Sequence, residues 1–364
     1  MTIAVAVSGG ADSLYALGSL REAGERCLAL HALFLPPPLR PPGHGAMLER
    51  LSGVCAALDI PLNVVDLTEP FRRAVIEPFV RAYARGETPN PCALCNAAIK
   101  FGLLLDHART LGAGALATGH YARLAPVPFG TGGTGGIGLF NGLDSGKDQS
   151  YFLSLVPVER LAHARFPLGS LRKSAVREWL AERGLAVPAP VESQEICFVP
   201  DDAYRGFVPG MAGELGVPLP GPGPVRLADG REIGRHAGLW RYTEGQRKGL
   251  GIAWSHPLYV VKKDMAANAL VVGSAEEMAE EGFRCEAVNF LVPPSEWPET
   301  VLLRTRYRQN AAPATVRFDG QGGAVFTQHP PKGPYTAGQL ATAYTRTPDG
   351  DFCVLGGGII SRRT

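Results

Sequence analysis

The chain has 364 residues, 45% of them hydrophobic, and its 36 Lys and Arg against 34 Asp and Glu give a net charge of +2. This length allows two or three domains with substantial cores, and the near-neutral balance excludes a globally basic nucleic-acid-binding protein, so that any basic site is local. With no cationic leader and no run of about 18 apolar residues, we expect a cytoplasmic protein without a membrane partner. Seven cysteines in such a chain favour thiol or metal chemistry over a disulfide framework.

A candidate phosphate-binding turn follows the first predicted strand. The apolar run at 3–7 leads into Ser-Gly-Gly-Ala-Asp-Ser at 8–13, which is typical of a buried strand that ends at a helix N-terminus, where free N–H groups hold anions. The glycines allow close approach, the hydroxyls of Ser8 and Ser13 can donate to phosphate oxygens, and Asp12 is a candidate Mg²⁺ ligand. The alternative is an ordinary tight turn with a polar cap. The spacing matches neither the Walker loop nor the dinucleotide fingerprint.

Strands and helices alternate after this turn. The periodicity predicts helices at 14–23, 48–58 and 71–83 and strands at 27–35 and 62–67. Such alternation is typical of an α/β domain built on a doubly wound parallel sheet. Because ligands bind at the carboxyl ends of the strands in these sheets, the turn after the first strand is expected to line the binding site.

Three cysteines lie in segments where a thiol can be reactive. Cys92 and Cys95 stand at the entrance of a helix predicted at 97–109, where the helix dipole would favour a thiolate. The alternative for this pair is two small buried core residues. Cys197 lies in a segment at 192–199 that its alternation predicts to be extended.

A strand predicted at 115–118 brings Gly119 and His120 to the same edge of the sheet as the phosphate turn. His120 taken alone is more typical of a hydrogen-bonded packing residue than of a catalyst. A glycine-rich hairpin or mobile loop is expected at 129–138. Lys147 after it is a candidate phosphate ligand, and the alternative is a solvated lysine beside a helix cap.

The second half of the chain is richer in Pro and Gly. The change begins after Asp201 and marks a domain boundary, and an amphipathic helix is predicted before it at 172–184. Paired strands are predicted at 259–261 and 269–272, in a small mixed domain. From about residue 283, short strands between Pro and Gly turns predict a small β-barrel or sandwich.

Two basic segments in this half are candidate nucleic-acid contacts. Arg247 and Lys248 project from a glycine-flanked loop. In 303–309 the three arginines share strand parity, so they are expected on one face of a strand with Tyr307 on the other, which suits phosphates or RNA. A charged surface turn and an ordinary ladder of ion pairs are the alternatives.

The turn at 8–13 resembles the PP-loop of ATP pyrophosphatases, which split ATP between the α and β phosphates, and this likeness implies adenylation of an oxygen. With seven further stretches in the same order, most of the chain resembles the tRNA-specific 2-thiouridylases. The further stretches are Asn-Pro-Cys-Ala-Leu-Cys-Asn at 90–96 with Ile-Lys-Phe at 99–101, Gly-His-Tyr at 119–121, Lys-Asp-Gln-Ser-Tyr-Phe at 147–152, Ile-Cys-Phe at 196–198, Gly-Gln-Arg-Lys-Gly-Leu-Gly at 245–251, Arg-Tyr-Arg-Gln at 306–309 and Gly-Gly-Gly-Ile-Ile at 356–360.

The resemblance implies a tRNA-uridine 2-sulfurtransferase. Such an enzyme adenylates the C2 oxygen of the wobble uridine with ATP and replaces it by persulfide sulfur, which gives 2-thiouridine, AMP and pyrophosphate. The implied domains are a PP-loop ATP-binding catalytic domain at 1–200, a small mixed α/β domain that contacts tRNA at 201–278 and a C-terminal β-barrel at 279–364. The implied cofactors are ATP and Mg²⁺, and the implied partners are tRNA and a persulfide donor, either a cysteine desulfurase or a sulfur-relay protein.

Individual residues take roles from the same resemblance. Cys95 matches the nucleophile and Cys197 the cysteine that carries the persulfide sulfur, and the two would end as a disulfide. The residues implied to bind ATP are Ala6, Val7, Ser8, Gly9, Gly10, Ala11, Asp12, Ser13, Leu35 and Gly119. Those implied to contact tRNA are Asn90, Pro91, Cys92, His120, Lys147, Asp148, Gln149, Arg306, Tyr307 and Gln339.

Two positions depart from the family pattern. Cys92 stands where the family usually has Asp, which removes a candidate general base, and Ala337 stands where it usually has Pro. Cys92 also opens an alternative, because Cys92, Cys95 and Cys197 could hold a 4Fe–4S cluster for sulfur insertion, or a zinc ion. An alternative of another class is a tRNA-binding protein without catalysis, against which the ATP loop and the cysteines argue.

Overall fold

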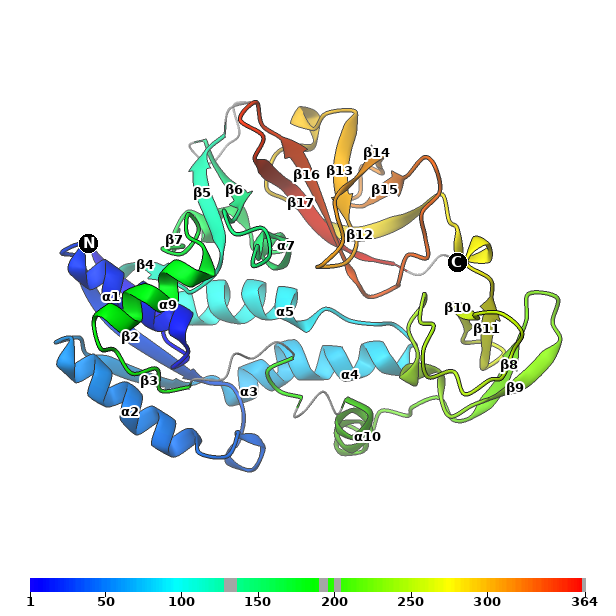
Figure 1. The fold of residues 1–364 in the computed structure, drawn as a ribbon, viewed down its shortest axis with the longest axis horizontal. Coiled ribbons are helices and arrows are strands. Elements are labelled where there is room, and N and C mark those ends of the chain that lie inside the picture. The colour runs from blue at the N-terminus through cyan, green and yellow to red at the C-terminus, as the bar shows by residue number, and fades with distance from the viewer. Residues whose placement is uncertain (128–135, 190–195, 200–203, 362–364) are drawn as a thin grey trace.

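The N-terminal part of the chain is built on a parallel β-sheet. The computed structural model describes residues 1–127, 136–189, 196–199 and 204–361 (Figure 1). The strands of the sheet are β1 (Thr2–Ala6), β2 (Arg26–Leu33), β3 (Leu62–Asp66), β4 (Ala113–Ala117) and β7 (Ala164–Arg165). They pair in the order β3-β2-β1-β4-β7, and each adjacent pair is parallel. The predicted doubly wound parallel sheet is therefore confirmed.

Helices cover both faces of this sheet because its strands are apolar on both sides. In β1, Ile3 and Val5 face one hydrophobic cluster and Ala4 faces the other. The helices of the first cluster are α1 (Ala11–Glu22), α2 (His44–Ala57) and α9 (Lys173–Glu182). Those of the second are α3 (Thr68–Phe71), the π-helix η2 (Arg72–Ile76), α4 (Glu77–Ala84), the π-helix η3 (Cys95–Leu104) and α6 (Leu105–Thr110).

The helix that carries Cys92 and Cys95 begins earlier than predicted. Its first part, α5 (Pro91–Leu94), starts at the proline because the Asn90 side chain accepts a hydrogen bond from the N–H of Ala93 (3.2 Å) and proline suits the first helical position. Both cysteines therefore lie inside the helix, which continues directly into η3.

A hairpin connects the first domain to the C-terminal one. Its strands are β5 (Ala122–Pro126) and β6 (Ile137–Asn141), and β6 pairs with the last strand of the chain through Phe140 and Cys353. Most of the glycine-rich stretch expected at 129–138 lies outside the described residues. The short helices α7 (Ser150–Leu153) and α8 (Val158–Leu161) follow the hairpin.

A small four-stranded sheet forms the middle of the chain. Its strands are β8 (Gly223–Arg226), β9 (Glu232–His236), β10 (Tyr259–Asp264) and β11 (Ala269–Gly273), in the order β10-β11-β8-β9. The strand pair predicted at 259–261 and 269–272 is thereby confirmed. Ahead of the sheet, α10 (Tyr204–Glu214) packs on α4, where Tyr204 stacks on Tyr83 with ring centroids 5.7 Å apart.

The C-terminal part closes into a β-barrel. Its six strands pair in the order β12-β15-β14-β13-β16-β17, and β12 also pairs with β17. The predicted barrel is therefore confirmed. The strands are β12 (Gly282–Phe290), β13 (Thr300–Arg304), β14 (Ala312–Phe318), β15 (Ala324–Thr327), β16 (Leu340–Arg346) and β17 (Phe352–Ile360). Single 3-10 turns are η1 (Pro37–Leu39), η5 (Leu239–Arg241), η6 (Glu276–Met278) and η7 (Pro294–Glu296).

The prediction of three arginines in line on one strand is wrong. Strand β13 ends at Arg304, so Arg306 and Arg308 lie in the turn that follows. The chain leaves the sheet there because the side chain of Gln309 accepts hydrogen bonds from both the N–H and the hydroxyl of Thr305.

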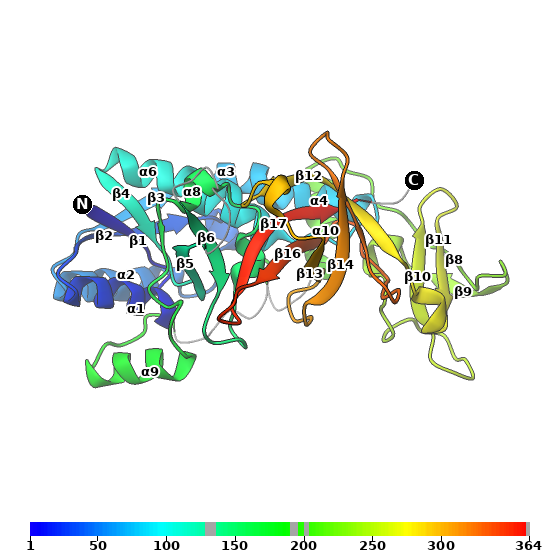
Figure 2. The ribbon, with the colours of Figure 1, turned by 90° about the horizontal axis from the view of Figure 1, so that it is seen from above.

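The barrel lies between the parallel sheet and the middle sheet, as the view from above shows (Figure 2). Helices α4 and α5 extend from the parallel sheet towards the middle sheet (Figure 1). None of the helices in the described ranges combines the length and apolar composition that crossing a bilayer requires.

Candidate functional site

The turn between β1 and α1 is built to present backbone N–H groups. Gly9 has φ +84°, a conformation that glycine adopts without strain. The hydroxyl of Ser13 donates to the carbonyl of Gly10 (2.9 Å) and accepts from the N–H of Ser8 (3.2 Å), which holds the turn closed. The N-cap residue of α1 is Gly10, which has no side chain that could cap the helix. The helix N-terminus can therefore receive an anion.

Gly119 touches this turn from the end of β4. A Cβ added to Gly119 would lie 3.0 Å from the carbonyl carbon of Asp12 and 3.1 Å from the nitrogen of Ser13, so a larger residue would displace the start of α1. Leu35, also expected to line the nucleotide site, is buried, and its carbonyl accepts a hydrogen bond from Nε of Arg40 (2.8 Å).

The carboxylate of Asp12 is held by two side chains. Nζ of Lys173 lies 2.6 Å from Oδ1 and the hydroxyl of Tyr121 donates to the same oxygen (2.8 Å). Lys173 is buried at the first position of α9, and its own N–H donates to Asp144 (3.0 Å). Both bonds go to Oδ1, so the carboxylate of Asp12 is held in one orientation at the start of α1.

Lys173 is a residue that the sequence reasoning missed. It lies in a stretch expected to be an amphipathic helix, where a lysine is normally solvated. One signal was available, since a cation in the first turn of a helix opposes the helix dipole and needs a compensating anion.

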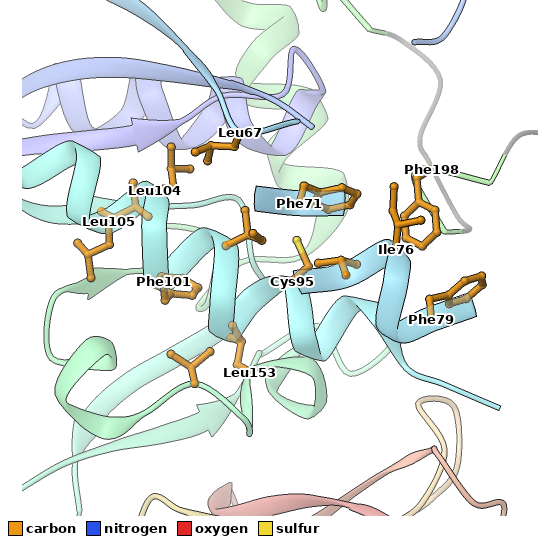
Figure 3. Packing of buried hydrophobic residues seen from close by; sticks show 14 of the residues in the cluster. Leu67, Phe71, Ile76, Phe79, Cys95, Phe101, Leu104, Leu105, Leu153 and Phe198 are labelled. Atoms are coloured by element: carbon orange, nitrogen blue, oxygen red, sulfur yellow. The ribbon is translucent and has the colours of Figure 1, made fainter. Parts of the chain in front are cut away.

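Cys95 is buried in the apolar cluster beneath the sheet. Figure 3 shows it in the group that also contains Phe71, Ile76 and Phe198. Phe198 packs edge-on against Phe71 and Phe79, with ring centroids 5.7 Å and 5.1 Å apart. This aromatic contact brings the next segment of the site towards the cysteine helix.

Cys197 lies in that segment, next to Phe198. Residues 196–199 form a turn in which the N–H of Val199 donates to the carbonyl of Ile196 (3.0 Å), so the predicted extended conformation is wrong for this part; 192–195 lie outside the described residues. Cys197 is exposed and, like Cys92 and Cys95, is a free thiol.

The thiols at this site are protonated at neutral pH. Desolvation raises the pKa of the buried Cys95 to about 12. Cys92 and Cys197 are exposed as whole residues, but surrounding protein atoms desolvate their thiol groups, which raises the pKa of Cys197 to about 11 and also raises that of Cys92. The positive charge of Lys100 opposes these shifts at all three cysteines, and negative charge on one cysteine raises the pKa of another. The expectation that the helix dipole favours a thiolate is therefore wrong for this conformation, because desolvation has the larger effect.

Lys100 and His120 form a pair beside the cysteines. Nζ of Lys100 lies 3.4 Å from Nε2 of His120, and the hydroxyl of Thr118 lies 2.7 Å from Nδ1. Burial and the nearby Lys100 hold the pKa of His120 well below its usual value, so the imidazole is neutral and accepts the ammonium proton at Nε2. Lys100 pairs with no carboxylate in the described part of the chain. His120 is buried and acts here as a hydrogen-bonded packing residue.

The described residues contain no group of three or more His, Cys, Asp or Glu side chains placed to hold a metal ion. Cys92, Cys95 and Cys197 are all among them, and they interact electrostatically without forming a ligand set. The described residues therefore form no ligand set for an iron–sulfur cluster or a zinc ion.

Several residues expected to contact tRNA make internal contacts instead of lying free. Asp148 is buried, accepts from the N–H groups of Gly142 and Ser150 (both 3.1 Å) and pairs with Arg304 (2.8 Å). Gln149 accepts a hydrogen bond from the N–H of Tyr121 (3.1 Å).

Three of the remaining members of the set lie at the barrel. Tyr307 packs on Phe152 with ring centroids 4.5 Å apart, and Arg306, which is exposed, donates to the carbonyl of Glu244 (2.9 Å). Gln339 donates to a carbonyl of the first domain. Asn90 and Pro91 are buried, Cys92 is exposed and Lys147 is half-buried.

Comparison with known proteins covers nearly the whole chain. Residues 1–201 match the family model described as tRNA methyl transferase HUP domain, 217–274 the tRNA methyl transferase PRC-barrel domain and 280–360 the aminomethyltransferase beta-barrel domain. A protein named tRNA-specific 2-thiouridylase MnmA from Oleidesulfovibrio alaskensis is 52% identical over 366 residues, which cover 99% of each chain. Proteins of the same name from Nitratidesulfovibrio vulgaris and Lawsonia intracellularis are 53% and 46% identical, again over 99% of both chains.

Proposed function

The chain belongs to the tRNA-specific 2-thiouridylase family, and on that premise we propose that it uses ATP to convert a uridine of tRNA into 2-thiouridine. The observation that carries this conclusion is the 52% identity to a 2-thiouridylase over 99% of both chains. The matching family models carry a methyl transferase description. A PP-loop fits ATP cleavage and the cysteines fit sulfur transfer, so we retain the thiolation activity.

ATP binds, in this proposal, at the N-terminus of α1. The N–H groups of the 9–13 turn hold the phosphates, and Gly119 leaves room for the turn to keep its shape. Mg²⁺ bound through Asp12 would neutralise charge on the departing pyrophosphate. Lys173 fixes the orientation of Asp12 and adds a positive charge to the site.

Adenylation makes the uridine reactive. The C2 carbonyl is a poor electrophile, and transfer of AMP to O2 converts that oxygen into a phosphate leaving group while pyrophosphate departs. Sulfur arrives on Cys197 as a persulfide from a donor protein. The terminal sulfur attacks C2 and AMP leaves, so that the base is joined to Cys197 through a disulfide.

Cys95 then releases the product. Its thiolate attacks Sγ of Cys197, the bond to the transferred sulfur breaks, and 2-thiouridine leaves while Cys95 and Cys197 form a disulfide. A dithiol reductant returns the pair to two thiols. Because burial raises the pKa of Cys95 to about 12, the proton must leave Cys95 during this step, and we propose that Lys100 stabilises the resulting thiolate.

We favour this route over sulfur insertion by a 4Fe–4S cluster, because the three thiols form no ligand set in the described residues. We propose that the enzyme works without a metal cluster, in the cytoplasm, with tRNA and a persulfide donor as its partners. A binding protein without catalysis is a third possibility, and it would form no AMP when tRNA and ATP are added together.

In vitro thiolation tests the proposal. Metal-free protein is incubated with unmodified tRNA, ATP, Mg²⁺ and a persulfide donor, and 2-thiouridine is measured by mass spectrometry. We expect 2-thiouridine and an equal amount of AMP. Product only after anaerobic loading with iron and sulfide would overturn the persulfide route, and methylated tRNA formed with S-adenosylmethionine in place of ATP would overturn the thiolation activity.

A further inference from the structure

Three parts of the chain meet at the segment that leads into the cysteine helix. In that segment, the N–H of Thr88 donates to the carbonyl of Ala337 in the barrel (2.8 Å), and the Thr88 hydroxyl lies 3.2 Å from the hydroxyl of Thr243 in the middle domain. Nε2 of Gln339 donates to the carbonyl of Thr88 (3.0 Å) and lies 3.5 Å from that of Pro89. The barrel therefore holds the backbone just ahead of the helix, and the middle domain contacts the side chain of Thr88.

The backbones at this junction are in direct contact. Gly338 has φ +87°, and a Cβ added there would lie 2.9 Å from the Cβ of Glu87 and 3.1 Å from the nitrogen of Thr88. On the other side of the helix start, Leu340 packs with Ala93 and Tyr151 in one buried cluster. Residues 338–340 thus contact the chain both before and after the capping residue of the helix.

The loop of the middle domain that contains Thr243 also contacts the barrel. The carbonyl of Glu244, next to Thr243, accepts a hydrogen bond from Arg306 (2.9 Å), and its carboxylate lies 3.4 Å from the ammonium of the buried Lys263. The exposed basic residues Arg247 and Lys248 follow in the same loop. A nucleic acid bound to this loop would therefore act on a segment that is tied to Thr88.

We propose that Gln339 is a positioning residue for Cys95. It holds the carbonyls of Thr88 and Pro89. Asn90 is thereby kept in place to cap the helix, and the helix keeps Cys95 in the position from which it reacts. The proposal rests on the proposed function, because it assigns Gln339 to the thiolation reaction. It replaces a direct contact with tRNA by an internal clamp between the barrel and the catalytic helix.

Kinetics separate the two roles. Gln339→Met keeps the volume and removes the donor, Thr243→Val removes the hydroxyl that reaches Thr88, and Gln321→Met changes an exposed glutamine of the barrel as a control. We expect Gln339→Met to lower kcat for 2-thiouridine formation about tenfold and Thr243→Val about threefold, with the Kd for tRNA unchanged within about twofold. Normal kcat with a weaker Kd would show a direct tRNA contact and overturn the proposal.

Hydrogen exchange tests the clamp without activity. In the free protein, the amide of Ala93 is bonded to Asn90, and we expect Gln339→Met to speed its exchange about fivefold while Gln321→Met leaves it unchanged. Identical exchange in Gln339→Met and the unmodified protein would overturn the clamp. If the unmodified protein makes no 2-thiouridine, the proposed function fails while this measurement still decides whether Gln339 orders the helix start.

Discussion

The turn at 8–13, proposed to bind ATP, and the segments of Cys95 and Cys197, proposed to transfer sulfur, differ in the free protein. The side chains of the turn already have their partners, and the two thiols are free. At the turn, Asp12 already has its lysine and tyrosine partners, and Ser13 already closes the loop. At the thiols, Cys95 and Cys197 come from separate segments, both are free, and desolvation of the thiol groups raises their pKa values to about 12 and about 11. In the proposed function, the ATP site would therefore be formed before substrate binds, whereas the sulfur site would not.

This difference follows from what each half of the reaction requires. Preformed N–H groups and a fixed carboxylate bind phosphates at low entropic cost. In the proposed mechanism, a persulfide is instead loaded by one protein and delivered to a base held by another molecule, so its cysteine has to be reachable. On the same proposal, a protonated, resting Cys95 would avoid reaction with that persulfide before the uridine has been adenylated.

The largest effect is expected from removing the thiol of Cys95 or Cys197. We expect Cys95→Ser and Cys197→Ser each to lower 2-thiouridine formation on the order of a thousandfold or more, because serine can neither carry sulfur nor form the disulfide. Both variants should still bind ATP with normal affinity, which equilibrium dialysis measures. Cys27→Ser, at a half-buried cysteine of β2, is the control. Residual thiolation within tenfold of normal in Cys197→Ser would remove this residue from the pathway.

The next largest effect is expected from removing the positive charge of Lys173 beside the 8–13 turn. Lys173→Met leaves Asp12 without its cation, and we expect AMP formation to fall about a hundredfold, with a loss of roughly 2 kcal/mol in the free energy of unfolding because a charged hydrogen bond in a mostly buried place disappears. Thermal unfolding and AMP release measure the two effects. Lys332→Met, at an exposed lysine of the barrel, should change neither. Normal AMP formation in Lys173→Met would show that Asp12 does not need the charge of Lys173.

A smaller effect is expected from crowding the turn. The Cβ of Gly119→Ala would press on Asp12 and Ser13 at 3.0 Å and 3.1 Å, so we expect the KM for ATP to rise about tenfold. Gly53→Ala, in α2 with open space around the added methyl, is the matched control. Alkylation of Cys92 and Cys95 should stay unchanged in Gly119→Ala, and a change there would mean that the two regions are mechanically coupled in the free protein.

How much of this was readable from the sequence depends on whether a feature is local. The βαβ alternation, the Ser-Gly-Gly turn and the barrel follow from hydrophobic period and turn residues, and the structure confirms the sheet and the barrel. The prediction that Arg304, Arg306 and Arg308 share one face is wrong because it assumes that the strand continues. The strand ends at Arg304, where the side chain of Gln309 binds Thr305. The helix of the two cysteines starts at Pro91, ahead of the predicted 97, because the Asn90 side chain caps it there.

The site shows the same limit. Lys173 lies 161 positions from Asp12 along the chain, and their pairing depends on how α9 docks on the sheet, which no local pattern contains. The reactivity expected for Cys95 from the helix dipole was reversed by desolvation, because burial comes from Phe71, Ile76 and Phe198 on other segments. The roles taken from the family resemblance remain predictions that the variants above test.

The smallest effect concerns the charge beside the resting thiols. Because burial raises the pKa of Cys95 to about 12, its thiolate fraction, and with it the rate of alkylation by iodoacetamide, should rise about tenfold per pH unit from pH 7 to 9 without a plateau. Lys100 lowers this pKa, so Lys100→Met should raise it further and slow alkylation about threefold at each pH. Peptide mass spectrometry measures the rate, with Cys27 as the internal control. A plateau below pH 9 would mean that the free protein already holds a Cys95 thiolate, and the sulfur site would then be as well prepared as the nucleotide turn.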